Sequence, residues 1–347
     1  MRRWLSALLL LSAVPALAEG LPEIHLKIVG GLGQTIQYKK YEEPFWAQQL
    51  AEHSNGRITA EVTPWDRTGI AGSELLGLTR LGAISFGTIS LSQIASEDPE
   101  AAGADLAGLN PDIRSLRASI DAHLPVLREI YRTRYGLELL AVWTYPAQVV
   151  FCNKPIRGLA DLRGRKVRVA SAMHGDFVRG LGGVDVAIPY NGLMDAFRKG
   201  VTDCAITAAM SGYQLGLHQV TTHLDPVTVS WGPYVLLANH AAWTRLGPTV
   251  QRFIERELAD LSGRLWQAAE SEGKDGVTCL TGNGACSAGP SGHMRLVEVG
   301  DEDRKLVRRS LLDAVLPRWT ERCGEQCVEE WDRTVGRVSG VTAAEEH

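Results

Sequence analysis

Hydrophobic and polar positions alternate along the chain with two different periods, and each change of period predicts a change between strand and helix. The segment IHLKIVG, residues 24–30, has the two-residue period of a strand. A glycine-rich turn and a helical segment, residues 41–50, follow it. RITAEVTPW at residues 57–65 is strand-like, SELLGLTRLG is a short helix, and AISFGTIS at residues 83–90 is a buried strand. This order predicts a parallel α/β sheet.

The same alternation returns after residue 150. RKVRVAS, VDVAIP and VTDCAITAA are strand-like, whereas HGDFVRGLGG and YNGLMDAFRKG are typical of helices that end at glycine. We therefore predict two α/β units with a changeover near residues 145–152.

A long helix is predicted from Pro248 to about Glu272. Its apolar positions follow the 3.6-residue period and are Val250, Phe253, Ile254, Leu258, Leu261 and Leu265. A helix of this length is able to lie across both units. A further helical segment is expected around residues 304–323.

Composition narrows the class of protein. The chain has 347 residues, of which 45% are hydrophobic and 22% charged, and its formal net charge is −4. These values are typical of a globular protein of one or two domains. The absence of a strongly basic balance argues against a nucleic-acid partner.

The first 18 residues resemble a secretory signal peptide. Arg2 and Arg3 precede an apolar run at residues 4–14, and Ala16-Leu17-Ala18 forms an A-x-A cleavage site. The alternative is a membrane anchor, but the run is shorter than the roughly 20 residues that span a bilayer. We expect cleavage after Ala18 and export to the periplasm.

Six cysteines fit an oxidising compartment. The simplest pairing joins near neighbours, although other connectivities stay open. The expected pairs are Cys279 with Cys286, Cys323 with Cys327, and Cys152 with Cys204. A metal site is the alternative, but the C-x6-C and C-x3-C spacings differ from the usual zinc pattern.

No local motif for catalysis or for a cofactor is visible. Gly31 and Gly33 begin a G-x-G pattern after the first strand, but Ile36 occupies the third glycine position, so a plain turn is the better interpretation. His218 and His223 lack a metal-ligand spacing. We expect no metal and no cofactor.

Arg168 is a permanent cation in the short apolar strand RKVRVAS. Its two neighbours, Val167 and Val169, share one face of the strand, so Arg168 takes the other face. Near a strand end, its guanidinium is able to bind a ligand carboxylate with two parallel hydrogen bonds. The alternative is an ion pair with a nearby acid such as Asp203. The residues alone leave both open.

Four segments in order resemble the solute-binding proteins of tripartite ATP-independent periplasmic (TRAP) transporters. The similar stretches are GRITAEVTPWDRTGIAGSELLGLTRLGAISFGT, NKPIRGLADLRGRKVRVAS, GGVDVAIPYNGLMDAFRKGVTDCAIT and SWGPYVLLANHAAWTRLGPTVQRFI. The second is the most specific, and the likeness extends from about residue 24 to residue 270. The arginine that binds a ligand carboxylate in this family matches Arg168.

The resemblance implies an α/β, two-lobed periplasmic binding protein fold with a long helix across both lobes. Lobe I would comprise residues 19–146 and 237–275, and lobe II residues 147–236 and 276–347. The lobes would close on a small organic anion without catalysis, and a monomer would deliver it to small and large TRAP membrane subunits. The alternatives are a binding protein of another transporter or sensor, or a periplasmic cleft enzyme.

The chain departs from the family pattern at several positions. Gln148 stands in the segment where members often have a second basic or polar residue, and PWDRTGI adds Trp65. These departures leave the usual dicarboxylate ligand in question. An aromatic and an aliphatic acid both stay open.

Further cleft candidates follow strand ends. Trp231 is expected near the crossover, with interlobe packing as its alternative role, and Asn239 is either a ligand contact or a cap. Tyr190 precedes a helix N-terminus, which favours an anion. The other candidates are Gln34, Tyr38, Ser90 and Gln93.

Overall fold

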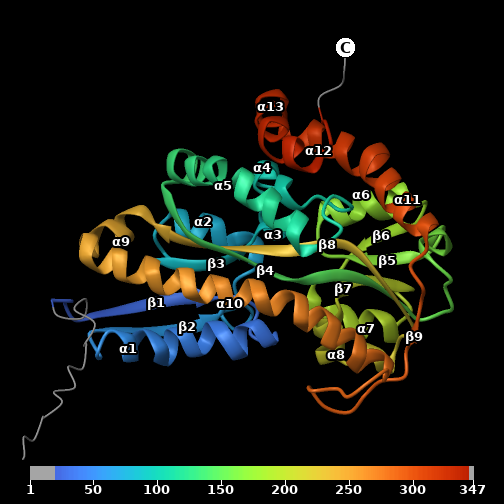
Figure 1. The fold of residues 1–347 in the computed structure, drawn as a ribbon, viewed down its shortest axis with the longest axis horizontal. Helices are drawn as coiled ribbons and strands as arrows, with labels where there is room; N and C mark the ends of the chain where they lie inside the picture. The colour runs from blue at the N-terminus through green and yellow to red at the C-terminus, as the bar shows by residue number, and fades with distance from the viewer. Residues whose placement is uncertain (1–19, 344–347) are drawn as a thin grey trace, which may run out of the picture.

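The computed structural model describes residues 20–343 and shows a mixed α/β protein (Figure 1). The signal peptide expected at residues 1–18 lies outside the described residues. The strands are β1 (Ile24–Gly30), β2 (Ile58–Pro64), β3 (Phe86–Ser90), β4 (Leu137–Cys152), β5 (Lys166–Val169), β6 (Val184–Ala187), β7 (Cys204–Ala208), β8 (His223–Asn239) and β9 (Arg295–Leu296).

Helices surround this sheet. They are α1 (Leu50–His53), α2 (Leu75–Arg80), α3 (Leu91–Ile94), α4 (Pro99–Ala102), α5 (Ile113–Tyr135), α6 (Ala172–Gly180), α7 (Leu193–Arg198), α8 (Ala209–Leu215), α9 (His240–Arg245), α10 (Gly247–Thr281), α11 (Asp301–Ser310), α12 (Leu316–Cys323), α13 (Glu325–Trp331) and α14 (Arg337–Ser339). Two π-helical segments, Tyr38–Glu42 and Phe45–Gln49, precede α1. None of the helices within residues 20–343 has the length and hydropathy that a bilayer crossing requires.

The strands form one sheet in the order β2-β1-β3-β8-β4-β7-β5-β6, and β9 pairs with β8. The pairs β1–β2, β1–β3, β5–β6 and β5–β7 are parallel, as the alternating pattern predicts. Each parallel group joins the centre through an antiparallel contact, because β3 pairs with β8 and β7 pairs with β4. The prediction of a parallel sheet is therefore confirmed for the strand pairs within each α/β unit. It is wrong for the central pairs β3–β8, β8–β4 and β4–β7, which are antiparallel.

Strands β4 and β8 are the elements that the sequence pattern missed. They run antiparallel along almost their whole length and belong to both lobes. Their register shifts between Tyr145 and Gln148, at the position where the lobe boundary in β4 is predicted. Because both strands are buried on two faces, they lack the alternation that identifies a half-exposed strand.

Helix α10 spans both lobes, as predicted, and extends beyond Glu272 to Thr281 (Figure 1). In lobe I, Ser262 Oγ and Trp266 Nε1 donate hydrogen bonds of 2.6 and 3.0 Å to the carbonyl oxygen of Val142 in β4. In lobe II, Gly276 packs so closely on α8 that a Cβ would collide with the main chain of Met210. Helix α10 therefore contacts both lobes.

The C-terminal helices pack on both halves as well. Ser310 at the end of α11 donates to the Phe177 carbonyl of α6 at 2.9 Å. Trp319 and Trp331 donate to the carbonyls of Pro99 and Gly103 at 2.8 and 2.7 Å. The chain after α11 therefore covers a part of lobe I. The lobe boundaries at residues 146, 236 and 275 stay a prediction.

The structure contains the three expected disulfides. Cys152–Cys204 joins neighbouring residues of β4 and β7, Cys279–Cys286 closes the loop after α10, and Cys323–Cys327 links α12 to α13. All six cysteines are paired. The first bond fixes the strand that carries Gln148 to the strand next to Arg168.

Candidate functional site

A cavity of about 600 Å³ lies between the two lobes. Lobe I contributes the turn after β1, the start of the segment after β2 and the N-terminus of α3. Lobe II contributes the ends of β5, β6 and β7 with the helices that follow them. The crossing strands β4 and β8 form the base through Tyr145, Gln148, Trp231, Gly232 and Tyr234.

Arg168 is in the lobe II wall of this cavity and is only 3% exposed. Its Nε donates to the Ile188 carbonyl at 2.8 Å, and one terminal nitrogen donates to the Ile206 carbonyl at 2.9 Å. Val167 and Val169 are buried in the core, as the strand pattern predicts. Two main-chain carbonyls thus fix the guanidinium, and its remaining N–H donors have no protein partner among residues 20–343.

The charge of Arg168 has no protein counterion among the described residues. The carboxylate of Asp203, the alternative partner, accepts instead from the Lys166 main-chain N–H at 3.0 Å. Burial lowers the pKa of Arg168 to about 10, which keeps it protonated at neutral pH. Since a buried cation is costly unless it is paired, this arrangement favours an anion from outside the chain.

His174 in α6 also lines the cavity, although no sequence motif singled it out. Its Nε2 lies 2.7 Å from Ser230 Oγ of β8, and its Nδ1 has no partner. Burial, assisted by the nearby Arg168 charge, lowers the pKa of His174 to about 3. The imidazole is therefore neutral and adds no second cation.

Aromatic rings form the base of the cavity. Tyr145 and Tyr234 stack with centroids 4.3 Å apart. The indole N–H of Trp231 donates to the Asn110 carbonyl at 3.1 Å, and Tyr190 donates to the Ser211 carbonyl at 2.9 Å. These hydrogen bonds hold the Trp231 and Tyr190 rings in fixed positions in the cavity lining.

The lobe I wall carries neutral polar groups. Ser90 and Ser92 share a hydrogen bond of 2.9 Å. Trp65 Nε1 and Gln93 Oε1 have no hydrogen-bond partner in the protein, and the Gln93 amide packs directly on Gly72. Both atoms are buried within the lobe I wall, so the hydroxyls of Ser90 and Ser92 are polar groups that this wall offers to the cavity.

Seven predicted site residues line this cavity: Arg168, Gln148, Trp231, Tyr190, Ser90, Gln93 and Trp65. The sequence missed Thr35, Tyr145, His174, Thr207, Ser211 and Tyr234, which also line it. Most of these come from β4, β7, β8 and their ends, where the strand assignment was incomplete or no polar signal stood out.

Three predicted residues lie off the cavity lining. Asn239 caps α9, accepting from the Ala242 N–H at 3.2 Å and donating to the carbonyls of Thr79 and Arg80. Tyr38 is buried in lobe I and is 1% exposed. Gln34 is exposed and donates from Nε2 to Asn191 Oδ1 of lobe II at 3.2 Å.

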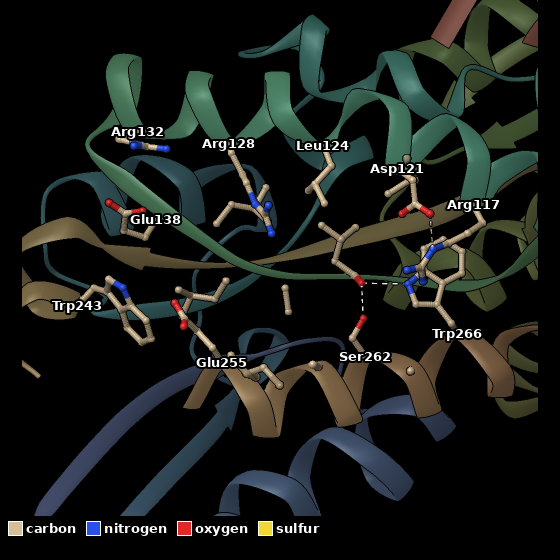
Figure 2. A pocket seen from close by; sticks show the side chains of 18 residues that line it. Arg117, Asp121, Leu124, Arg128, Arg132, Glu138, Trp243, Glu255, Ser262 and Trp266 are labelled. Carbon is tan, nitrogen blue, oxygen red and sulfur yellow. Dashed lines mark hydrogen bonds and ion pairs between the residues drawn. The ribbon is translucent and has the colours of Figure 1, made fainter. Parts of the chain in front are cut away.

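A second hollow of similar volume lies between α5 and α10 (Figure 2). Arg117 pairs with Asp121 at 3.0 Å and covers the Trp266 ring. Arg128 projects into the hollow from α5, and Glu255 projects from α10. Charges of both signs line this groove, whereas Arg168 is the one arginine, lysine or acidic residue in the lining of the interlobe cavity.

Within residues 20–343, no group of histidine, cysteine and acidic side chains has a geometry that would hold a metal ion. The polar side chains that line the interlobe cavity carry one guanidinium, one neutral imidazole, amides, hydroxyls and two indoles. This donor set suits an organic anion.

Comparison with known proteins agrees with this architecture. A curated relative, the uncharacterized protein YiiZ of Salmonella typhimurium, is 24% identical over 224 residues; the match covers 62% of this chain and 66% of the relative. DctP7, a Bordetella pertussis extracytoplasmic solute receptor binding pyroglutamic acid, superposes with a TM-score of 0.78 at 18% identity, covering 89% of this chain and 99% of that one. 

A TRAP periplasmic solute-binding protein from Desulfovibrio salexigens with bound orotic acid gives a TM-score of 0.78 at 17% identity, covering 90% and 99% of the two chains. The family model for bacterial extracellular solute-binding proteins, family 7, matches residues 33–286. The chain therefore belongs to the bacterial extracellular solute-binding proteins of family 7.

Proposed function

We propose that this protein is a periplasmic receptor that captures a small organic acid between its lobes and delivers it to a TRAP transporter. The observation that carries the proposal is Arg168, a buried cation that faces the interlobe cavity without a counterion. A ligand carboxylate would supply the missing charge and accept the N–H donors that the protein leaves free.

The relatives support an acid as the ligand class. The Bordetella receptor binds pyroglutamic acid, and the Desulfovibrio protein holds orotic acid. The cavity of about 600 Å³ has room for a molecule of either size. The chemistry at Arg168 and the family membership thus point to the same class of solute.

Binding would draw the lobes together about the crossing of β4 and β8. Closure would remove water from the cavity and strengthen each hydrogen bond to the ligand. The closed monomer would then dock on the small and large TRAP membrane subunits after export and loss of residues 1–18. The receptor itself would carry out no catalysis.

A thermal-shift screen of organic acids tests the proposal. An acid at 100 times its dissociation constant is expected to stabilise the protein by about 2.7 kcal/mol. Arg168→Met keeps the apolar stem and removes the charge, so it should abolish the shift. Arg128→Met, at an exposed position of α5, is the matched control and should retain the shift. A full shift in folded Arg168→Met protein would refute the role of the cation.

A further inference from the structure

We infer that the receptor selects monocarboxylates: acids with one negative charge, no ammonium group and an uncharged polar body. This inference rests on the proposed function and specifies its ligand class. It depends on which charged side chains line the interlobe cavity and on which nearby charged side chains lie outside its lining.

One permanent charge faces the cavity. Among its lining residues, Arg168 is the only lysine, arginine, aspartate or glutamate. Gln148 lies on β4 opposite Ala208 of β7 and is neutral, so it offers no second cation to the cavity. The amide of Gln148 makes only a long hydrogen bond of 3.4 Å to the Pro146 carbonyl. A dicarboxylate would therefore leave one desolvated charge without a cation.

His174 does not supply the second cation. The Nε2 atom of His174 forms a hydrogen bond with Ser230. The positive charge of Arg168, on the nearby strand β5, lowers the pKa of His174 further. The imidazole stays neutral throughout the neutral pH range, because burial and the adjacent guanidinium both oppose protonation. The net charge of the lining is thus a single positive charge.

An ammonium group on the ligand would also lack a partner. The buried carboxylate behind the cavity belongs to Glu42, which accepts hydrogen bonds from the Gly31 N–H and from Thr88. Glu42 is not among the lining residues of the cavity, and its carboxylate packs on Gly31 together with the Tyr145 hydroxyl. Asp66 is likewise occupied by the Gly33 N–H at 2.8 Å and is not among the lining residues.

The remaining surface suits a neutral body. Tyr145 and Tyr234 offer stacked rings at the base. On the lobe I side, the lining carries the hydroxyl groups of Ser90 and Ser92. A ligand with its carboxylate on Arg168 would place a hydroxyl, lactam or amide group against these hydroxyls. Such a group hydrogen-bonds them without adding charge.

Calorimetric titration of sets of related acids tests the inference. The probes are pyroglutamate against glutamate, 2-furoate against 2,5-furandicarboxylate, and the carboxamide of each monocarboxylate. We expect at least one monocarboxylate to bind at least 100-fold more tightly than its dicarboxylate, amino-acid or carboxamide counterpart. Pyroglutamate and glutamate are the sharpest pair, because opening the lactam ring creates both an ammonium group and a second carboxylate.

The outcomes separate the inference from the proposed function. Tighter binding of the dicarboxylates, lost in Arg168→Met, would overturn the inference and leave the receptor proposal standing. Absence of binding by every acid in the thermal-shift screen would overturn both. Gln148→Arg should shift preference toward 2,5-furandicarboxylate by at least tenfold, whereas Gln148→Met should not. If Gln148→Arg does not fold, the wild-type ratios alone decide.

Discussion

Gln34 and Asn191 bridge the two lobes: Gln34 Nε2 donates to Asn191 Oδ1 at 3.2 Å, although 157 residues separate them in sequence. Both side chains are exposed, one after β1 and the other between β6 and α7. If the lobes open and close as proposed, this hydrogen bond would be present only while they are close together and would be lost when they part.

Gln34→Ala should accelerate ligand release. An exposed neutral hydrogen bond contributes about 0.5–1.5 kcal/mol, so the dissociation rate is expected to rise about two- to tenfold. Stopped-flow fluorescence of a bound acid measures this rate. Gln34→Glu keeps the length and lets the Asn191 amide, once flipped, donate to a carboxylate, so it should release more slowly than Gln34→Ala. Equal release rates in wild type and Gln34→Ala would contradict a closing contact.

Asn239→Ala should lower stability without changing ligand affinity. The side chain caps α9 and also ties β8 to the end of α2 through Thr79 and Arg80. Loss of such a cap costs about 1 kcal/mol of unfolding free energy. Chemical denaturation measures the loss, and calorimetry of a bound acid supplies the comparison. A fall in affinity with unchanged stability would restore Asn239 as a ligand contact.

The parallel strands of each lobe could be predicted from the sequence because they alternate with amphipathic helices, and those helices end at glycine. The sequence did not predict β4 and β8 as strands, because both are mostly buried and show no clear period-two pattern. The same strands carry Tyr145 and Tyr234, so these residues were missed together. Arg168 stood out because a charge in an apolar strand is conspicuous. His174 did not, because nothing in the sequence pairs it with Ser230.

Gly276 marks the tightest contact between α10 and α8. A Cβ there would collide with the Met210 main chain, which cannot move without distorting α8. Gly276→Ala should therefore destabilise the protein by about 1–3 kcal/mol. Gly263 lies on the same helix with open space around its Cα, so Gly263→Ala should stabilise by about 0.5–1 kcal/mol. Thermal denaturation of both variants measures the contrast, and a stabilised Gly276→Ala protein would contradict the close approach.

Glu42 makes stability depend on pH. Burial raises its pKa to about 7, against 4.5 for a free side chain, despite hydrogen bonds from Thr88 and the Gly31 N–H. Between these two values the folded protein holds a proton that the unfolded chain has lost. The contribution of Glu42 to stability is therefore present below about pH 4.5 and is lost as the pH rises through 7.

The loss amounts to on the order of 3 kcal/mol of unfolding free energy between pH 5 and pH 8. Glu42→Gln has no proton to lose, so urea denaturation across this range should show a flatter pH dependence than wild type. Thr88→Val removes a donor that stabilises the carboxylate, which raises the pKa further and extends the loss of stability to higher pH. Identical slopes in wild type and Glu42→Gln would show that Glu42 does not take up a proton on folding, and that the carboxylate behind Tyr145 stays charged.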